Sequence, residues 1–134
     1  YFEGVIERQD TRQVLRRLKR GRVVWYAPDQ DYGRKHSVFA PFFGVNAATI
    51  TATARFASLN NSPVLMFLHT RNDETGQWIL KFHPVLADYP TGDEVADATR
   101  MNSMLESLIR ETPAQYLWLH KRFKTRPEGE PSLY

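Results

Sequence analysis

The strongest constraint on the fold is a set of apolar side chains that recur at helical spacing between residues 98 and 109. The members of this set are Ala98, Met101, Met104, Leu105, Leu108 and Ile109. The spacing predicts an amphipathic helix with one buried face. Thr91 and Glu94 have the residue types of a capping box at its start, and Pro113 closes it. We interpret the methionines as core filler and not as metal ligands.

A second helix is predicted near the start of the chain. Asp10 followed by Gln13 is typical of a helix N-terminus, and Gly21 is typical of a helix end. Basic residues at i, i+4 spacing line one face of this helix: Arg12, Arg16 and Arg20. Like charges at this spacing repel by a few tenths of a kcal/mol. Such a stripe is more typical of a solvent-facing surface than of a binding site.

The rest of the chain is predicted as strands, one further helix and a polar loop. Residues 23–27 form an unbroken apolar run, which favours a strand covered on both faces, as in a parallel sheet. Residues 28–45 are expected to form a loop. Residues 47–59 are rich in Ala and Thr and are predicted as a helix close to the sheet. Residues 64–68 are predicted as a second buried strand, paired with residues 78–82 in a hairpin.

Basic residues concentrate in two segments. Residues 1–22 hold seven basic side chains against three acids, and residues 121–126 hold four with no acid among them. Such clusters indicate either an anionic partner or a solvated surface. The chain contains no cysteine, which excludes a disulfide framework and a cysteine-based zinc site. No apolar run approaches the ~20 residues that a membrane span needs.

Several blocks of sequence carry a resemblance to a known family. The first is VWYAPDQDYG at residues 24–33, which is followed by shorter blocks at residues 37–39 and 48–51. The last are PAQYLWLH at residues 113–120 and RFKTRP at residues 122–127. In this order they are similar to the lauroyl and myristoyl acyltransferases of bacterial lipid A biosynthesis. The resemblance implies the C-terminal part of a glycerolipid-acyltransferase-like α/β domain, with a mostly parallel sheet flanked by helices.

The activity that this resemblance implies is acyl transfer. In the family, the histidine of a His-x4-Glu (or Asp) pair removes a proton from a hydroxyl, and the alkoxide attacks the thioester of acyl carrier protein. The hydroxyl belongs to a 3-hydroxyacyl chain on a Kdo-lipid A precursor, at the cytoplasmic face of the inner membrane. We expect no cofactor and no metal site.

The histidine motif matches the sequence twice as text, and neither match has the expected context. His69 precedes Glu74 across a predicted hairpin turn, and His83 precedes Asp88 at a predicted strand end. Both follow the acidic loop, whereas the family motif precedes it. We therefore expect the catalytic histidine and a membrane anchor to lie outside this chain. Residues 1–134 are then the C-terminal portion of a single domain and are inactive alone.

The supporting site residues are expected around the acidic loop. Arg8 is expected to orient a phosphate or the thioester carbonyl, because its guanidinium offers a planar fork of donors. The alternative is a surface ion pair with Glu7 or Asp10. Asp31 is the acid expected to act with Arg8 or to hold sugar hydroxyls, and Asp29 is a second candidate for substrate binding. Both acids follow the strand predicted over residues 23–27, and ligands in open α/β sheets bind at the carboxyl ends of strands.

Further substrate-binding candidates complete the loop and the basic C-terminus. Tyr32 and Gly33 belong to the loop, and Gly33 permits a backbone turn. Three basic residues are expected to face lipid phosphates, the inner-membrane surface or the acidic acyl carrier protein: Arg122, Lys124 and Arg126. The role of His120 is open between a structural one and one near a phosphate. The rival hypothesis is a non-catalytic domain that binds an anionic ligand or nucleic acid. No nucleic-acid recognition motif supports it, so we expect no nucleic-acid partner.

Overall fold

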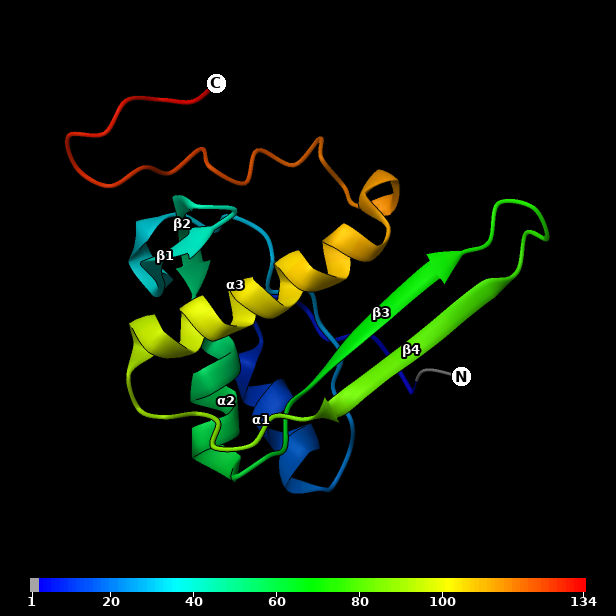
Figure 1. The fold of residues 1–134 in the computed structure, drawn as a ribbon. Coiled ribbons are helices and arrows are strands. Elements are labelled where there is room, and N and C mark those ends of the chain that lie inside the picture. The colour runs from blue at the N-terminus through cyan, green and yellow to red at the C-terminus, as the bar shows by residue number, and fades with distance from the viewer. Residues whose placement is uncertain (1–2) are drawn as a thin grey trace.

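The computed structural model describes residues 3–134, which form a mixed α/β structure. The elements are α1 (Thr11–Lys19), η1 (Arg34–His36), β1 (Ser37–Phe42), β2 (Val45–Ile50), α2 (Ala52–Asn60), β3 (Leu65–Arg71), β4 (Trp78–Val85), α3 (Glu94–Glu111) and η2 (Pro113–Gln115). Helix α3 spans the molecule, with the C-terminal segment along one side of it and α1 and α2 on the other (Figure 1). The β3–β4 hairpin extends away from this body (Figure 1). Within these residues, no helix combines the length and apolar character that crossing a membrane requires.

The helix predicted from the periodic apolar residues is confirmed as α3, and it ends just before Pro113. Its N-cap is Asp93, whose carboxylate accepts hydrogen bonds from two backbone amides of the first turn at 2.9 and 3.0 Å. The predicted capping box of Thr91 and Glu94 is therefore wrong. Thr91 instead donates its amide and hydroxyl to the buried carboxylate of Asp97. The buried face includes Ala98, Met101, Leu108 and Ile109.

Helix α1 begins and ends as predicted. The Asp10 carboxylate accepts a hydrogen bond from the amide of Gln13 at 2.9 Å. At the other end, Gly21 has a φ of 70°, and its amide bonds the carbonyl of Leu18. The next amide, of Arg22, bonds the carbonyl of Arg17, which completes a Schellman motif. Local capping chemistry therefore defines this helix.

The helix predicted over residues 47–59 is wrong in its first part. Residues up to Ile50 form strand β2, which pairs antiparallel with β1, and α2 begins only at Ala52. The two strands meet in a two-residue turn at Phe43 and Gly44, both with positive φ (49° and 78°). The loop expected over residues 28–45 thus contains β1. The sequence does not predict this turn, because a bulky residue such as Phe43 rarely adopts positive φ.

Residues 3–134 do not form the mostly parallel sheet that the resemblance implies. Residues 3–134 contain two sheets, each with two antiparallel strands. Residues 23–27 form no strand, and Val23 and Trp25 are 96% and 59% exposed. An apolar run predicts burial, but it does not specify which segment covers it. No strand of residues 3–134 pairs with this run.

The hairpin predicted from residues 64–68 and 78–82 is confirmed as β3 and β4. The burial expected for the first of these strands is wrong, since none of the residues of β3 is buried. One face of the hairpin is open and apolar, and Phe82 on it is 67% exposed. This open face, defined by strand register, comprises the apolar residues Leu65, Phe67, Trp78, Leu80, Phe82 and Val85 together with His69 and Arg71.

The core lies where the β1–β2 sheet, α3 and the C-terminal segment meet. Phe42, Ala47 and Ile109 are buried together. Phe43, Leu105, Tyr116 and Phe123 pack against them. Full burial of a side chain such as Phe42 contributes about 1.5–3 kcal/mol. The C-terminal segment, defined here as residues 116–134, is thus part of the core.

Candidate functional site

Asp31, in the acidic loop of residues 28–33, is held by the C-terminal segment. Asp31 is 3% exposed. One carboxylate oxygen accepts hydrogen bonds from the Gly33 amide (2.8 Å) and the Thr125 hydroxyl (2.9 Å). The other oxygen accepts a hydrogen bond from the Thr125 amide at 2.8 Å. The backbone amide of Asp31 donates a hydrogen bond to Nε2 of His120 at 2.9 Å. The carboxylate is therefore committed to protein donors.

The guanidinium of Arg8 lies over the ring of Tyr32, the residue that follows Asp31 in the sequence. The guanidinium carbon is 5.4 Å from the ring centroid, which is a cation–π distance. Arg8 is exposed, and among residues 3–134 it forms no ion pair with Glu7 or Asp10. Gly33 has a φ of 81°, so the turn predicted for it is confirmed. The exposed guanidinium of Arg8 thus places a positive charge beside the acidic loop.

Asp29, the second acid of the loop, lies near the C-terminal segment as well. Burial raises the pKa of the Tyr116 hydroxyl above its ordinary value, and the charge of Asp29 raises this pKa further. Burial lowers the pKa of Arg122, and the charges of Asp31 and Asp29 oppose this shift. Both acids of the loop therefore face residues of the C-terminal segment.

Arg122 is buried and not at the surface. It is 3% exposed, and its guanidinium donates to the carbonyl of Ala48 (2.7 Å) and the hydroxyl of Thr49 (2.9 Å). It also lies 5.2 Å from the ring centroid of Phe42 and 3.4 Å from the amide oxygen of Asn102. This residue ties the C-terminal segment to β2 and α3.

The other two basic candidates near the C-terminus differ in environment. Lys124 is exposed. Arg126 donates to the carbonyl of Asn46 at 2.6 Å and forms an ion pair with Glu130. Only Lys124 of the three predicted residues presents its charge freely at the surface of the described chain.

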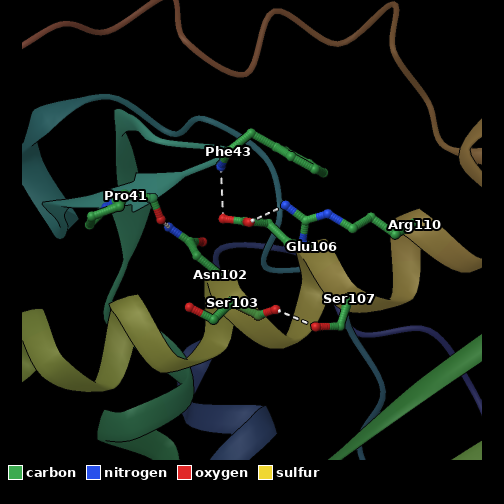
Figure 2. Close-up of polar contacts among 7 residues, drawn as sticks. All are labelled: Pro41, Phe43, Asn102, Ser103, Glu106, Ser107 and Arg110. Atoms are coloured by element: carbon green, nitrogen blue, oxygen red, sulfur yellow. Dashed lines mark hydrogen bonds and ion pairs between the residues drawn. The ribbon is translucent and has the colours of Figure 1, made fainter.

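Helix α3 holds the turn between β1 and β2 through polar contacts (Figure 2). The Glu106 carboxylate accepts the amide of Phe43 at 2.7 Å and pairs with Arg110 at 3.2 Å. The Asn102 amide donates to the carbonyl of Pro41 at 2.9 Å. These contacts stabilise the positive φ of Phe43, and they fix the strands against which Arg122 packs.

The structure brings Arg8, Tyr32, Asp31 and Gly33 together, but not as the crevice at a strand end that we expected. Residues 23–27, which precede the loop, form no strand, so Asp29 and Asp31 do not lie at the carboxyl end of one. The residues that sequence reasoning missed are Thr125 and Asn102, and His120 takes the structural role. No local signal marks Thr125 as a partner of Asp31, because the two are 94 positions apart.

The two histidine motif matches lie on the β3–β4 hairpin. His69 is an exposed residue of β3 and its ring stacks near Phe67, while Glu74 is in the turn. His83 is in β4, and Asp88 follows the strand. Glu74 lies in the hairpin turn as predicted, whereas β4 continues past His83 to Val85, so His83 is not at the strand end that the sequence predicts.

Together, the fold and site define a mixed α/β structure whose acidic loop is clamped by its own C-terminal segment. Residues 3–125 match the family described as bacterial lipid A biosynthesis acyltransferase, and the chain belongs to this family. It is 45% identical over 98% of its length to the lipid A biosynthesis palmitoleoyltransferase of Escherichia coli (strain K12). It is 41% identical over 98% of its length to the lauroyltransferase and 31% identical over 90% to the myristoyltransferase of the same organism.

The chain spans less than half the length of these curated relatives. It covers 43% of the palmitoleoyltransferase, 44% of the lauroyltransferase and 37% of the myristoyltransferase. The comparison with each relative therefore covers only a part of that protein.

Proposed function

We propose that the protein containing these residues transfers a fatty acyl chain from acyl carrier protein to a 3-hydroxyacyl chain on a Kdo-lipid A precursor. The acceptor hydroxyl loses its proton to a base, its oxygen attacks the thioester carbonyl, and the pantetheine thiol leaves with a proton. The observation that carries this proposal is the family match over residues 3–125. An acceptor of this kind sits in a bilayer, so we place the reaction at the cytoplasmic face of the inner membrane.

In this proposal the base is the histidine of a His-x4-Glu pair outside residues 1–134, and the chain supplies the supporting part of the site. Arg8 orients a phosphate or the thioester carbonyl, which its exposure and planar fork of donors support. Asp31 acts as a positioning residue, because its carboxylate is saturated by protein donors while it fixes the loop below Arg8. Asp29, Tyr32, Gly33, Lys124 and Arg126 remain proposed contacts of the substrate, and Arg122 acts through the packing of the C-terminal segment.

We further propose that residues 1–134 are the C-terminal portion of a single domain. The open apolar face of the β3–β4 hairpin and the exposed Val23 and Trp25 support this proposal. An isolated two-stranded hairpin is marginally stable, and apolar patches of this kind mark surfaces that another segment covers. In a whole family protein these surfaces would join a mostly parallel sheet.

A chimera tests the activity and the division of the site together. Residues 1–134 replace the aligned part of the lauroyltransferase, to which they are 41% identical. Lauroyl transfer from acyl carrier protein to the lipid A precursor is measured for the chimera, for the intact lauroyltransferase and for residues 1–134 alone. We expect transfer by the first two proteins and none by the isolated chain.

Two outcomes would overturn parts of this proposal. Turnover by residues 1–134 alone would show that the catalytic base lies within them. A chimera that folds cooperatively, as monitored by circular dichroism, and yet transfers no acyl chain would contradict the proposed function.

A further inference from the structure

The arginine stripe of α1 is an exposed polar face with no role in the site described above. The apolar residues Val14, Leu15 and Leu18 are half-buried on the side of α1 that packs toward α2. Because this apolar face packs toward α2, the face of α1 that is most open to a partner is the opposite, polar one. Any partner of the opposite face is therefore recognised by charge and hydrogen bonding.

Four side chains on this face form a groove of about 200 Å³. The lining residues are Gln13, Arg16, Arg17 and Arg20. They recur at positions i, i+3, i+4 and i+7, which places them along one side of the helix. Three guanidinium groups and one carboxamide thus line a shallow groove that is open to solvent.

The positive charge of this groove is only partly neutralised by the chain. Glu3 pairs with Arg17 at 3.2 Å and with Arg22 at 3.1 Å. The Asp10 carboxylate is used as the helix N-cap. Within residues 3–134, Arg16 and Arg20 form no ion pair. Two like charges at i, i+4 spacing repel, so an anion in the groove would remove a standing electrostatic cost.

We propose that the α1 groove, formed by Gln13, Arg16, Arg17 and Arg20, is a binding site for a phosphate group. Guanidinium forks match phosphate oxygens with paired hydrogen bonds, and the carboxamide of Gln13 adds a neutral donor. None of these four residues belongs to the site described above. This inference therefore goes beyond the proposed function. The phosphate belongs either to a lipid headgroup or to a small soluble ester.

Titration of the chain with inorganic phosphate, at constant ionic strength, measures the site directly. The test variant is Arg16→Gln with Arg20→Gln. The control is Lys35→Gln with Arg55→Gln, which removes the same charge at exposed positions outside the groove. Gln and Arg have similar helix propensity, so α1 is expected to persist, and circular dichroism checks this. We expect the Kd for phosphate to rise at least tenfold in the test variant and less than twofold in the control.

A third variant, Arg16→Lys with Arg20→Lys, separates fork geometry from net charge, and we expect it to bind phosphate more weakly than the wild-type chain. It also replaces the glutamine variant if that chain does not fold. A second arm measures co-sedimentation with phosphatidylcholine vesicles that contain phosphatidylglycerol. Groove-dependent binding of vesicles but not of inorganic phosphate would support a lipid headgroup as the source. If the test and control variants weaken both kinds of binding equally, or neither weakens them, the phosphate site is overturned.

Discussion

Asp31 and Thr125 are joined by two hydrogen bonds across 94 positions of the chain. The carboxylate accepts both the amide and the hydroxyl of Thr125, at 2.8 and 2.9 Å. Asp31 belongs to the first block of family resemblance and Thr125 to the last. The two blocks therefore form one structural unit, in which the C-terminal segment determines the shape of the acidic loop.

The first prediction concerns the strength of this clamp. Asp31→Asn keeps the shape of the side chain but removes its charge and replaces one acceptor with a donor. Hydrogen bonds to a charged group contribute about 1.5–3 kcal/mol, so we expect the free energy of unfolding to fall by about 1–3 kcal/mol. Urea denaturation measures this change. Asp73→Asn, in the exposed hairpin turn, serves as the control and should stay within about 0.5 kcal/mol. Equal stability of the two variants would contradict the clamp.

The second prediction concerns the burial of Arg122. Arg122→Lys keeps the charge but loses the planar fork that bonds Ala48 and Thr49. We expect a loss of about 1–3 kcal/mol in the free energy of unfolding, because buried acceptors lose their donors. The same denaturation experiment on Lys124→Ala is the control, since Lys124 is exposed. A change no larger than that of the control would mean that the Arg122 network adds no stability.

The third prediction concerns catalysis in the lauroyltransferase chimera. Arg8→Ala should lower turnover at least tenfold, which corresponds to about 1.4 kcal/mol of transition-state stabilisation. Arg8 is exposed, so thermal stability should stay close to that of the parent chimera. Arg55→Ala, which removes an exposed arginine from α2, is the matched control. Near-normal turnover of the Arg8 variant would remove Arg8 from the site.

Asp31→Ala in the same chimera is also expected to lower turnover at least tenfold, by displacing the loop. Because Asp31 is a positioning residue in our proposal, Thr125→Val should produce a loss in the same direction. A turnover unaffected by both substitutions would separate the clamp from catalysis.

The fourth prediction concerns stability at high pH. Burial raises the pKa of Tyr26 from 10.0 to about 12, while its hydrogen bond with Thr53 acts in the opposite direction. The folded state therefore keeps a proton that the unfolded state releases, and stability is lost as the pH rises from 10 towards 12. Each such proton changes the free energy of unfolding by about 1.4 kcal/mol per pH unit.

Denaturation at pH 8, 9, 10 and 11 measures this dependence. The free energy of unfolding should be level with respect to Tyr26 up to about pH 9 and should fall above pH 10. Tyr26→Phe should reduce the slope of this fall by the contribution of about one proton, or about 1.4 kcal/mol per pH unit. Part of the fall should remain, because burial also raises the pKa values of Tyr89 and Tyr116. An unchanged slope in the phenylalanine variant would contradict the burial of the Tyr26 hydroxyl.

The two regions that make up the candidate site could be predicted from the sequence, but the contacts between them could not. The resemblance pointed to the acidic loop and to the basic C-terminus as functional regions, and the structure brings these two regions together. The sequence does not predict the contact between Asp31 and Thr125, because the basic pattern of residues 122–126 indicates an exposed surface. Arg122 is buried because β2 and α3 together provide acceptors for its guanidinium. Those acceptors exist only once the chain has folded.

The sequence by itself determined the elements whose signals are local. Helix α1 is defined by a cap at Asp10 and a glycine at position 21, and α3 by apolar residues at helical spacing. Only the tertiary structure decided that residues 45–50 form a strand, that residues 23–27 pair with none, and that Asp31 is clamped by Thr125. The reason is physical. Caps and helical periodicity act over about one turn, whereas strand pairing and the burial of charge depend on partners from distant parts of the chain.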